Sequence, residues 1–175
     1  MKLKNRLLYL SQENICLEVV NLMGWINAWN TIIRKVIWPD HELKVLMKIP
    51  AKTNIIQFVD RYFIRAGFTN ALLTDETCRI VYSDTQGYDT AVPNIKKNLM
   101  IFDIYVKQSE MRNIGDDRLV TRADLITERL MKLLTSERYI QDTGYRFWIA
   151  GDWDGGTRVT GYIRKTIAFN YMKVY

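Results

Sequence analysis

The sequence is poor in the residues on which most catalytic and metal sites are built. It contains one histidine, His41, and two cysteines, Cys16 and Cys78, among 175 residues. A nucleophile–base pair usually needs histidine as its base, and we expect His41, beside Asp40 in a turn, to be an exposed surface residue. The cysteines are far apart and have no C-x-x-C pair or neighbouring histidine. They therefore predict buried thiols in a reducing compartment, and neither a disulfide nor a zinc site.

The sequence motifs of the common enzyme classes are absent as well. The chain has no G-x-S-x-G, H-E-x-x-H, P-loop or G-x-G-x-x-G sequence. Asp152 and Asp154 begin a stretch that resembles a calcium loop, but the later acidic ligands are missing. We interpret Gly151–Gly156 as a β-hairpin turn. The sequence thus predicts no catalytic residue, metal or cofactor, and we expect that the protein is not an enzyme.

Long apolar runs and linkers are also lacking. No stretch approaches the roughly 18 consecutive apolar residues of a membrane-spanning helix. Met1–Arg6 resembles the charged start of a secretory leader, but the apolar run Leu7–Leu10 is short and no small-residue cleavage site follows. We expect the protein to stay in the cytosol or in an assembly made there. With three prolines and no Gly/Pro-rich tract, the chain is predicted to form one domain, residues 1–175.

The composition that remains is that of an ordinary globular protein with a mild positive charge. Hydrophobic residues make up 48% and charged residues 25%, which argues against disorder. A net charge of +6 permits contact with nucleic acid without requiring it. Lys96 and Lys97 precede a predicted central strand and Lys107 follows it. If they line one surface, they are candidate DNA-facing residues that meet phosphate non-specifically; taken singly, they are ordinary surface charges.

The first part of the chain, residues 1–67, is predicted to be mostly helical. Apolar residues recur every three or four positions over residues 15–36, which predicts a helix of roughly 20 residues that Pro39 ends. The simpler interpretation is a helix packed in the core. In the alternative, Trp25, Trp29 and Trp38 contact a neighbouring subunit, because tryptophan is enriched at protein interfaces.

The second part, residues 76–175, is predicted to form a mainly antiparallel sheet with one helix, which gives an α+β fold. Thr121 and Asp124 have the spacing of a helix capping box. The closing segment is apolar on both sides, which is typical of a central strand. We expect helices at 40–48, 53–66 and 121–136, strands at 78–83, 99–107, 146–150, 157–163 and 166–175, and a loop or hairpin connection at 84–93.

One loop, residues 108–118, mixes charges of both signs. Its candidate residues are Arg112, Asp116, Asp117 and Arg118. Interleaved charges of this kind are more typical of a solvated or subunit-bridging loop than of a two-metal site. Together with the three tryptophans, these four residues are the candidate subunit-interface residues.

The segment from His41 to Tyr175 resembles the tail-terminator and neck (head–tail joining) proteins of tailed bacteriophages, particularly those of phages that infect Gram-positive bacteria. The resemblance lies in the type and order of residues in five stretches. These are Phe58–Ile64 (FVDRYFI), Leu72–Tyr82 (LLTDETCRIVY), Ile101–Lys107 (IFDIYVK), Asp117–Leu130 (DRLVTRADLITERL) and Gly161–Tyr171 (GYIRKTIAFNY). Residues 1–40 depart from the family pattern and form an extra, tryptophan-rich helical entry.

The resemblance implies a twisted sheet with helices packed on one face, and assembly into a homo-oligomeric, hexameric ring. Such a ring caps the tail tube or joins it to the neck, and DNA passes through its lumen without sequence-specific contact. The implied partners are further copies of the chain, the tail-tube protein, neck or connector proteins and DNA, with no membrane. The implied location is the virion, assembled in the cytoplasm of the host bacterium.

Two other functions stay open. A head–tail connector or completion protein at the neck would be built in the same way as a terminator. A protein of a different class, a non-specific nucleic-acid-binding module, would use the basic side chains as a monomer, and its DNA binding would weaken with salt.

Overall fold

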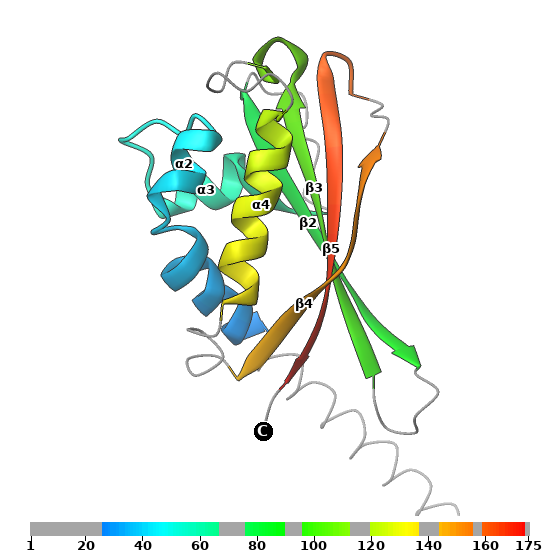
Figure 1. Ribbon diagram of the computed structural model, residues 1–175. Coiled ribbons are helices and arrows are strands. Elements are labelled where there is room, and N and C mark those ends of the chain that lie inside the picture. Colours follow the sequence, from blue (N-terminus) through cyan, green and yellow to red (C-terminus); the bar gives the residue numbers. More distant parts are fainter. Residues whose placement is uncertain are drawn as a thin grey trace, which may run out of the picture.

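The computed structural model describes residues 26–66, 76–89, 96–112, 120–136, 144–155 and 159–173. The fold is α+β, as predicted: a five-stranded sheet with helices packed on one face (Figure 1). The strands are β1 (Phe63–Arg65), β2 (Cys78–Asp89), β3 (Lys96–Lys107), β4 (Tyr145–Gly155) and β5 (Tyr162–Lys173). Their order in the sheet is β1-β2-β3-β5-β4. β1 pairs with β2 in parallel and the other pairs are antiparallel, which confirms a mainly antiparallel sheet.

The strands are longer than predicted, because β-bulges keep two turn-like stretches in the sheet. The predicted connection at 84–93 is wrong over residues 84–89, where β2 continues past a bulge between Thr85 and Tyr88. The predicted hairpin turn at 151–156 is also wrong, because β4 continues to Gly155 past a bulge at Ala150. Such bulges insert an extra residue without ending the pairing. The prediction of a strand at 157–163 is wrong over residues 159–161, which form a turn; only Tyr162 and Ile163 of that stretch belong to β5. β5 also contains the predicted strand at 166–175 as far as Lys173, and it lies between β3 and β4 and is central, as expected.

The helical first part differs from the prediction mainly at helix ends. Residues 26–32 are α-helical and run into a π-helical turn, Ile33–Ile37, so the predicted helix is confirmed where it is described. Helix α2 (His41–Leu46) begins at Asp40, whose carboxylate accepts a hydrogen bond from the Leu43 amide at 2.7 Å. It ends two residues before the predicted end, and Lys48 takes a positive φ of 54°. Within the described residues, no helix is long and apolar enough to span a membrane.

Helix α3 (Ile55–Arg61) is shorter than predicted. It begins with a capping box formed by Asn54 and Gln57. The prediction of a helix as far as Ala66 is wrong, because residues 63–65 pair with Ile80, Val81 and Tyr82 of β2 as strand β1. This pairing buries Phe63 on one side of the sheet and Ile64 on the other, and a strand places successive side chains on opposite faces in this way.

Helix α4 (Arg122–Thr135) confirms both the predicted helix and its predicted capping box. Its capping box is formed by Thr121 and Asp124. The helix buries one stripe of side chains against the sheet: Ala123, Ile126, Thr127, Leu130 and Leu134. Leu133, the residue before Leu134, is only partly buried.

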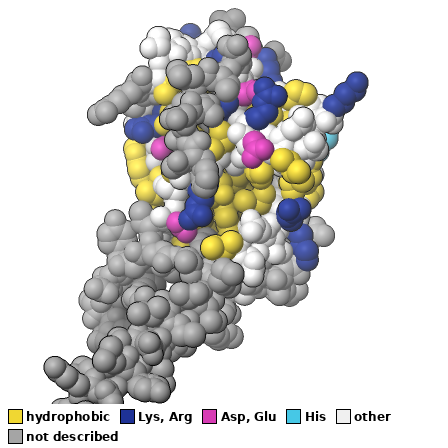
Figure 2. All heavy atoms as spheres, turned by 180° about the vertical axis from the view of Figure 1, so that it is seen from behind, with side chains coloured by type: hydrophobic (Ala, Val, Ile, Leu, Met, Phe, Trp, Pro, Cys, Tyr) yellow, Lys and Arg dark blue, Asp and Glu magenta, His cyan; other side chains and the backbone are white. Residues whose placement is uncertain are grey.

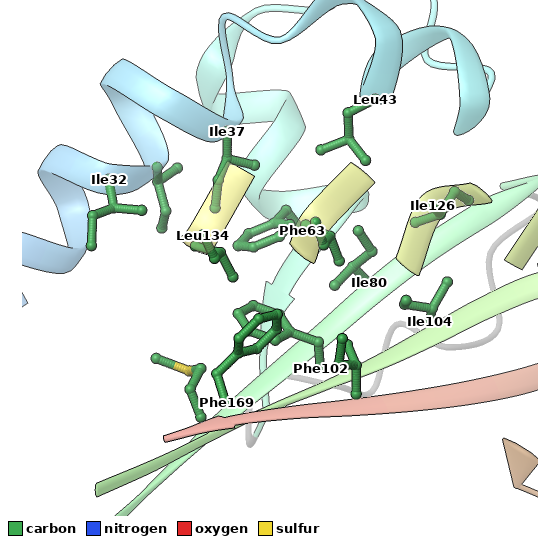
Figure 3. Packing of buried hydrophobic residues seen from close by; sticks show 14 of the residues in the cluster. Ile32, Ile37, Leu43, Phe63, Ile80, Phe102, Ile104, Ile126, Leu134 and Phe169 are labelled. Atoms are coloured by element: carbon green, nitrogen blue, oxygen red, sulfur yellow. The ribbon is translucent and has the colours of Figure 1, made fainter. Parts of the chain in front are cut away.

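The hydrophobic core fills the space between the helices and the sheet. Figure 3 shows Ile32 and Ile37 from the first helix and Leu134 from α4 turned toward Phe102 and Phe169 of the sheet. These side chains are at most 1% exposed. The core therefore joins both halves of the described chain.

A buried arginine, Arg122, ties three segments together at the start of α4. It is 4% exposed. Its Nε donates to the carbonyl of Glu110, in the 3-10 helix η2 (Gln108–Glu110), at 3.0 Å, and its Nη1 donates to the carbonyl of Leu46 in α2 at 2.7 Å. Both partners are backbone carbonyls, so the guanidinium acts as a fixed cross-link between α4, α2 and η2.

A second arginine in α4, Arg129, holds the start of α2. Its guanidinium binds both carboxylate oxygens of Asp40, at 3.0 and 2.5 Å, and contacts Glu42 at 2.6 Å. Burial raises the pKa of Asp40, but the hydrogen bonds from Arg129 and from the Leu43 amide outweigh burial and hold the pKa below its usual value. Bidentate arginine–carboxylate pairs are among the stronger polar contacts in proteins.

Candidate functional site

The two candidate interface tryptophans that the structure describes are used for packing inside the chain. Trp29 is 6% exposed and lies within the core, so it leaves little surface for a neighbouring subunit. Trp38 is partly buried: its ring centroid lies 5.2 Å from that of Phe58, and the Lys44 ammonium lies 3.5 Å from the ring centroid. Trp25 lies outside the described residues. For the described part of the first helix, the simpler interpretation as a core helix is confirmed.

The candidate interface charges are only partly described. Arg112 is exposed and lies just after η2. Asp116, Asp117 and Arg118 lie outside the described residues, so their role as a subunit-bridging loop stays a prediction.

The candidate DNA-facing lysines do not come together. Lys96 and Lys97 begin β3 and Lys107 ends it. At roughly 3.3 Å per residue, the backbone positions at the two ends lie about 35 Å apart. These three residues cannot form one compact basic patch within a subunit.

A further basic residue, Lys165 on β5, is already paired with carboxylates of the same chain. Its ammonium lies 2.5 Å from Asp124, 3.7 Å from Asp152 and 3.9 Å from Asp154, and its side chain is 14% exposed. Burial lowers the pKa of Lys165, but the hydrogen bond and charge of Asp124 outweigh burial, and the pKa lies above its usual value. Lys165 thus fastens the start of α4 to the sheet.

One edge of the sheet, formed by β4, is free. β4 has 11 residues and, in the part of the chain that the structure describes, pairs only with β5 (Figure 1). Two of its large apolar side chains, Ile149 and Trp153, are 46% and 48% exposed. A free edge presents unpaired backbone N–H and C=O groups, which readily pair with a strand of another chain. Sequence reasoning missed this edge because it read residues 151–156 as a turn.

The opposite edge of the sheet is also open over part of its length. β1 covers only Ile80–Tyr82 of β2, whereas β2 continues to Asp89. Among the described residues, no strand pairs with Ser83–Asp89 on the side away from β3. The sheet therefore has two different edges at which another chain can add a strand.

The sheet face opposite the helices carries a row of polar side chains. Arg79 of β2, Tyr105 of β3 and Arg164 of β5 are neighbours in the strand register. The Arg164 guanidinium lies over Gly155, where a Cβ would be 2.7 Å from its Nη2. Figure 2 views the molecule from behind: hydrophobic side chains occupy the middle of the visible described surface, and charged side chains of both signs lie around them.

The described residues include no cluster of three or more His, Cys, Asp or Glu side chains that could hold a metal ion.

Cys78 is a fully buried free thiol, as predicted, and burial raises the pKa of this thiol to about 12. The thiol therefore stays protonated at neutral pH and is a poor nucleophile. His41 is exposed, as expected, and Cys16 lies outside the described residues.

Comparison with known proteins gives one family. No curated protein matches the chain, and no solved structure matches it. The family model of YomW matches residues 6–151, which is more than half of the chain and includes everything from the first helix to the bulge of β4. The chain belongs to the YomW family.

Proposed function

We propose that this protein is a structural subunit of a tailed bacteriophage, a tail terminator that forms a ring at the junction of tail and neck. DNA passes through the ring, and the partners are further copies of the chain, the tail-tube protein and neck proteins. The proposal rests on the resemblance of residues 41–175 to tail-terminator and neck proteins and on one feature of the sheet. The alternative is a head–tail connector at the neck, which would form the same kind of ring but bind different partners.

The feature that carries the proposal is the sheet with two unlike open edges. A ring is built from heterologous contacts, in which one surface of each copy meets a different surface of the next. β4 offers one such surface, with Ile149 and Trp153 exposed, and Ser83–Asp89 of β2 offers another. Pairing of these edges between copies would continue the sheet around an axis and would cover apolar side chains that a monomer leaves in water.

The arrangement of basic residues gives less support to a dedicated nucleic-acid-binding module. The candidate lysines lie at opposite ends of β3, and Lys165 is paired with three carboxylates. Non-specific passage of DNA needs only a scattered positive charge that many copies share. This favours the ring over a monomer that grips DNA with a basic stripe.

The test is the oligomeric state of the full chain, measured by size-exclusion chromatography with light scattering and by negative-stain electron microscopy. We expect ring-shaped particles. Trp153→Lys on β4 should shift them toward monomers, because a charged edge residue opposes strand addition. The matched control is Ile56→Lys, since Ile56 is 66% exposed on helix α3 and belongs to neither β4 nor Ser83–Asp89 of β2.

Thermal unfolding shows whether each variant is folded. A wild-type chain that stays monomeric at every concentration would overturn the proposal. The β4 interface would be refuted if rings persisted in Trp153→Lys, or if Ile56→Lys dispersed them equally.

A further inference from the structure

Arg79 is a buried arginine whose guanidinium has no acceptor among the described residues. It is 3% exposed, and its Nε, Nη1 and Nη2 are all buried without a hydrogen-bond partner. Arg122 is equally buried, but its guanidinium donates to two carbonyls. A buried charge without partners is costly, because it loses its hydration and gains nothing in exchange. Burial accordingly lowers the pKa of Arg79.

The carboxylates nearest to Arg79 are already engaged. Glu76 is the acidic residue that acts most strongly on the Arg79 charge, but its carboxylate lies 2.7 Å from the guanidinium of Arg61. Asp103, farther along the same sheet face, accepts a hydrogen bond from Thr166 at 2.5 Å. The guanidinium of Arg79 therefore keeps its full capacity to donate to an incoming group.

Arg79 lines a narrow pocket on the helix-free face of the sheet, at the end where β5 begins. The other described residues around it are Tyr105, Val159 and Tyr162. No part of this space is wide enough for a water molecule, so hydration does not satisfy the guanidinium. The Tyr162 hydroxyl donates to the carbonyl of Glu76 at 2.7 Å, which fixes that wall of the pocket.

The opposite wall is a surface turn. Val159 belongs to the short turn that leads through Gly161 into β5. Gly161 has a φ of +81°, and nothing lies within 4 Å of the position where its Cβ would be. The Gly161 carbonyl accepts a hydrogen bond from the Gln108 amide at 2.9 Å. A group therefore reaches Arg79 only when this turn moves outward and that hydrogen bond opens, which leaves the core on the other face of the sheet in place.

We propose that the Arg79 pocket is a binding site for a single oxyanion group, a carboxylate or a phosphate. A planar guanidinium forms two parallel hydrogen bonds with either group. Tyrosine rings on two sides keep water away, and a charge-assisted hydrogen bond is stronger in such surroundings than in water. Binding gives the three buried nitrogens the acceptors that the described part of the chain does not supply. The site does not depend on the proposed ring and can be tested on a monomer or an assembly.

The experiment measures thermal unfolding of the full chain in sodium chloride, with inorganic phosphate or acetate replacing chloride at constant ionic strength. A ligand that binds the folded state raises the unfolding temperature in a saturable way. We expect such a rise with at least one anion. A larger rise with acetate identifies a carboxylate site and a larger rise with phosphate identifies a phosphate site.

Two variants assign the effect to the pocket. Arg79→Met should abolish the rise and, in chloride alone, should be at least as stable as the wild type, because an uncompensated buried charge has been removed. Arg65→Met is the matched control on the adjacent strand β1, where Arg65 is exposed and 3.7 Å from Asp84, and it should keep the rise. If Arg79→Met does not fold, Arg79→Lys keeps the charge without the planar fork and should weaken binding about tenfold or more.

The proposal is overturned if neither anion raises the unfolding temperature of the wild type above its value in chloride. It is equally overturned if the rise survives in the Arg79 variants, since the anion then binds elsewhere. Loss of the rise in Arg65→Met as well would point to a general charge effect and would also refute the site.

Discussion

Replacement of Arg122 by methionine tests the cross-link at the start of α4. Met has a similar length and no donor, so the substitution removes the hydrogen bonds to the carbonyls of Leu46 and Glu110 with little change in packing. Each hydrogen bond from a charged donor contributes about 1.5–3 kcal/mol. Part of this is offset, because the guanidinium no longer has to be desolvated. We expect a net loss of about 3 kcal/mol in the free energy of unfolding, or roughly 6–12 °C in the unfolding temperature of a domain of this size.

Urea unfolding followed by tryptophan fluorescence measures the loss, since Trp29 lies in the core and reports its disruption. Arg112→Met is the control: Arg112 is exposed in the same region, and its replacement should change the free energy by less than about 0.5 kcal/mol. A loss below about 1 kcal/mol in Arg122→Met would refute the reasoning, because the cost of burying the guanidinium would then cancel its hydrogen bonds.

Three further predictions concern titratable groups. Lys165→Met leaves three carboxylates without their cation and should cost about 2 kcal/mol at pH 7, with recovery toward pH 4 as they become protonated; a loss independent of pH in urea unfolding would contradict this. For Asp40 and Asp124, burial raises the pKa, but hydrogen bonds, chiefly from Arg129 and Lys165 respectively, outweigh it and leave both values below the usual 3.8. The two carboxylates therefore stabilise the fold fully at pH values well above 3.8, and this stabilisation is lost as the pH falls through their lowered folded-state pKa values. The urea concentration at the unfolding midpoint should accordingly fall between about pH 5 and pH 2.5, and a constant midpoint would refute this prediction. In a Cys16→Ser background, Cys78 should resist iodoacetamide at pH 8 in the native protein and react in urea, whereas rapid native alkylation would contradict its burial.

The parts of the fold that the sequence predicts well are those with local signals. Helix α4 was located to within a residue because Thr121 and Asp124 form a capping box with each other and the apolar stripe follows directly. Strand β1 was missed for the opposite reason. Phe63 and Ile64 fit the helical pattern of residues 53–66, and only their pairing with Ile80 and Val81, distant in sequence, makes them a strand.

The roles of the polar residues on and around the sheet were harder to predict, because they depend on partners that are distant in the sequence. Asp152 and Asp154 are typical turn residues, and the residue that keeps them in a strand position, Lys165, lies on the next strand. Arginine is seldom fully buried, so nothing local marks Arg79 and Arg122 as buried. Their difference, one satisfied and one not, depends on the carbonyls that the folded chain places around each guanidinium.

The bulge at Ala150 connects the fold with the proposed assembly. Before the bulge, Tyr145 and Phe147 share the helix-covered face and are buried. After it, Asp152 takes that face beside Lys165, and Trp153 turns to the opposite face, where it stays 48% exposed. Because side chains alternate along a strand, a β4 without the extra residue would place Trp153 toward Lys165 and the aspartates away from it. The bulge thus satisfies the lysine inside the subunit and, by the same shift, leaves a tryptophan on the free edge that a neighbouring copy can cover.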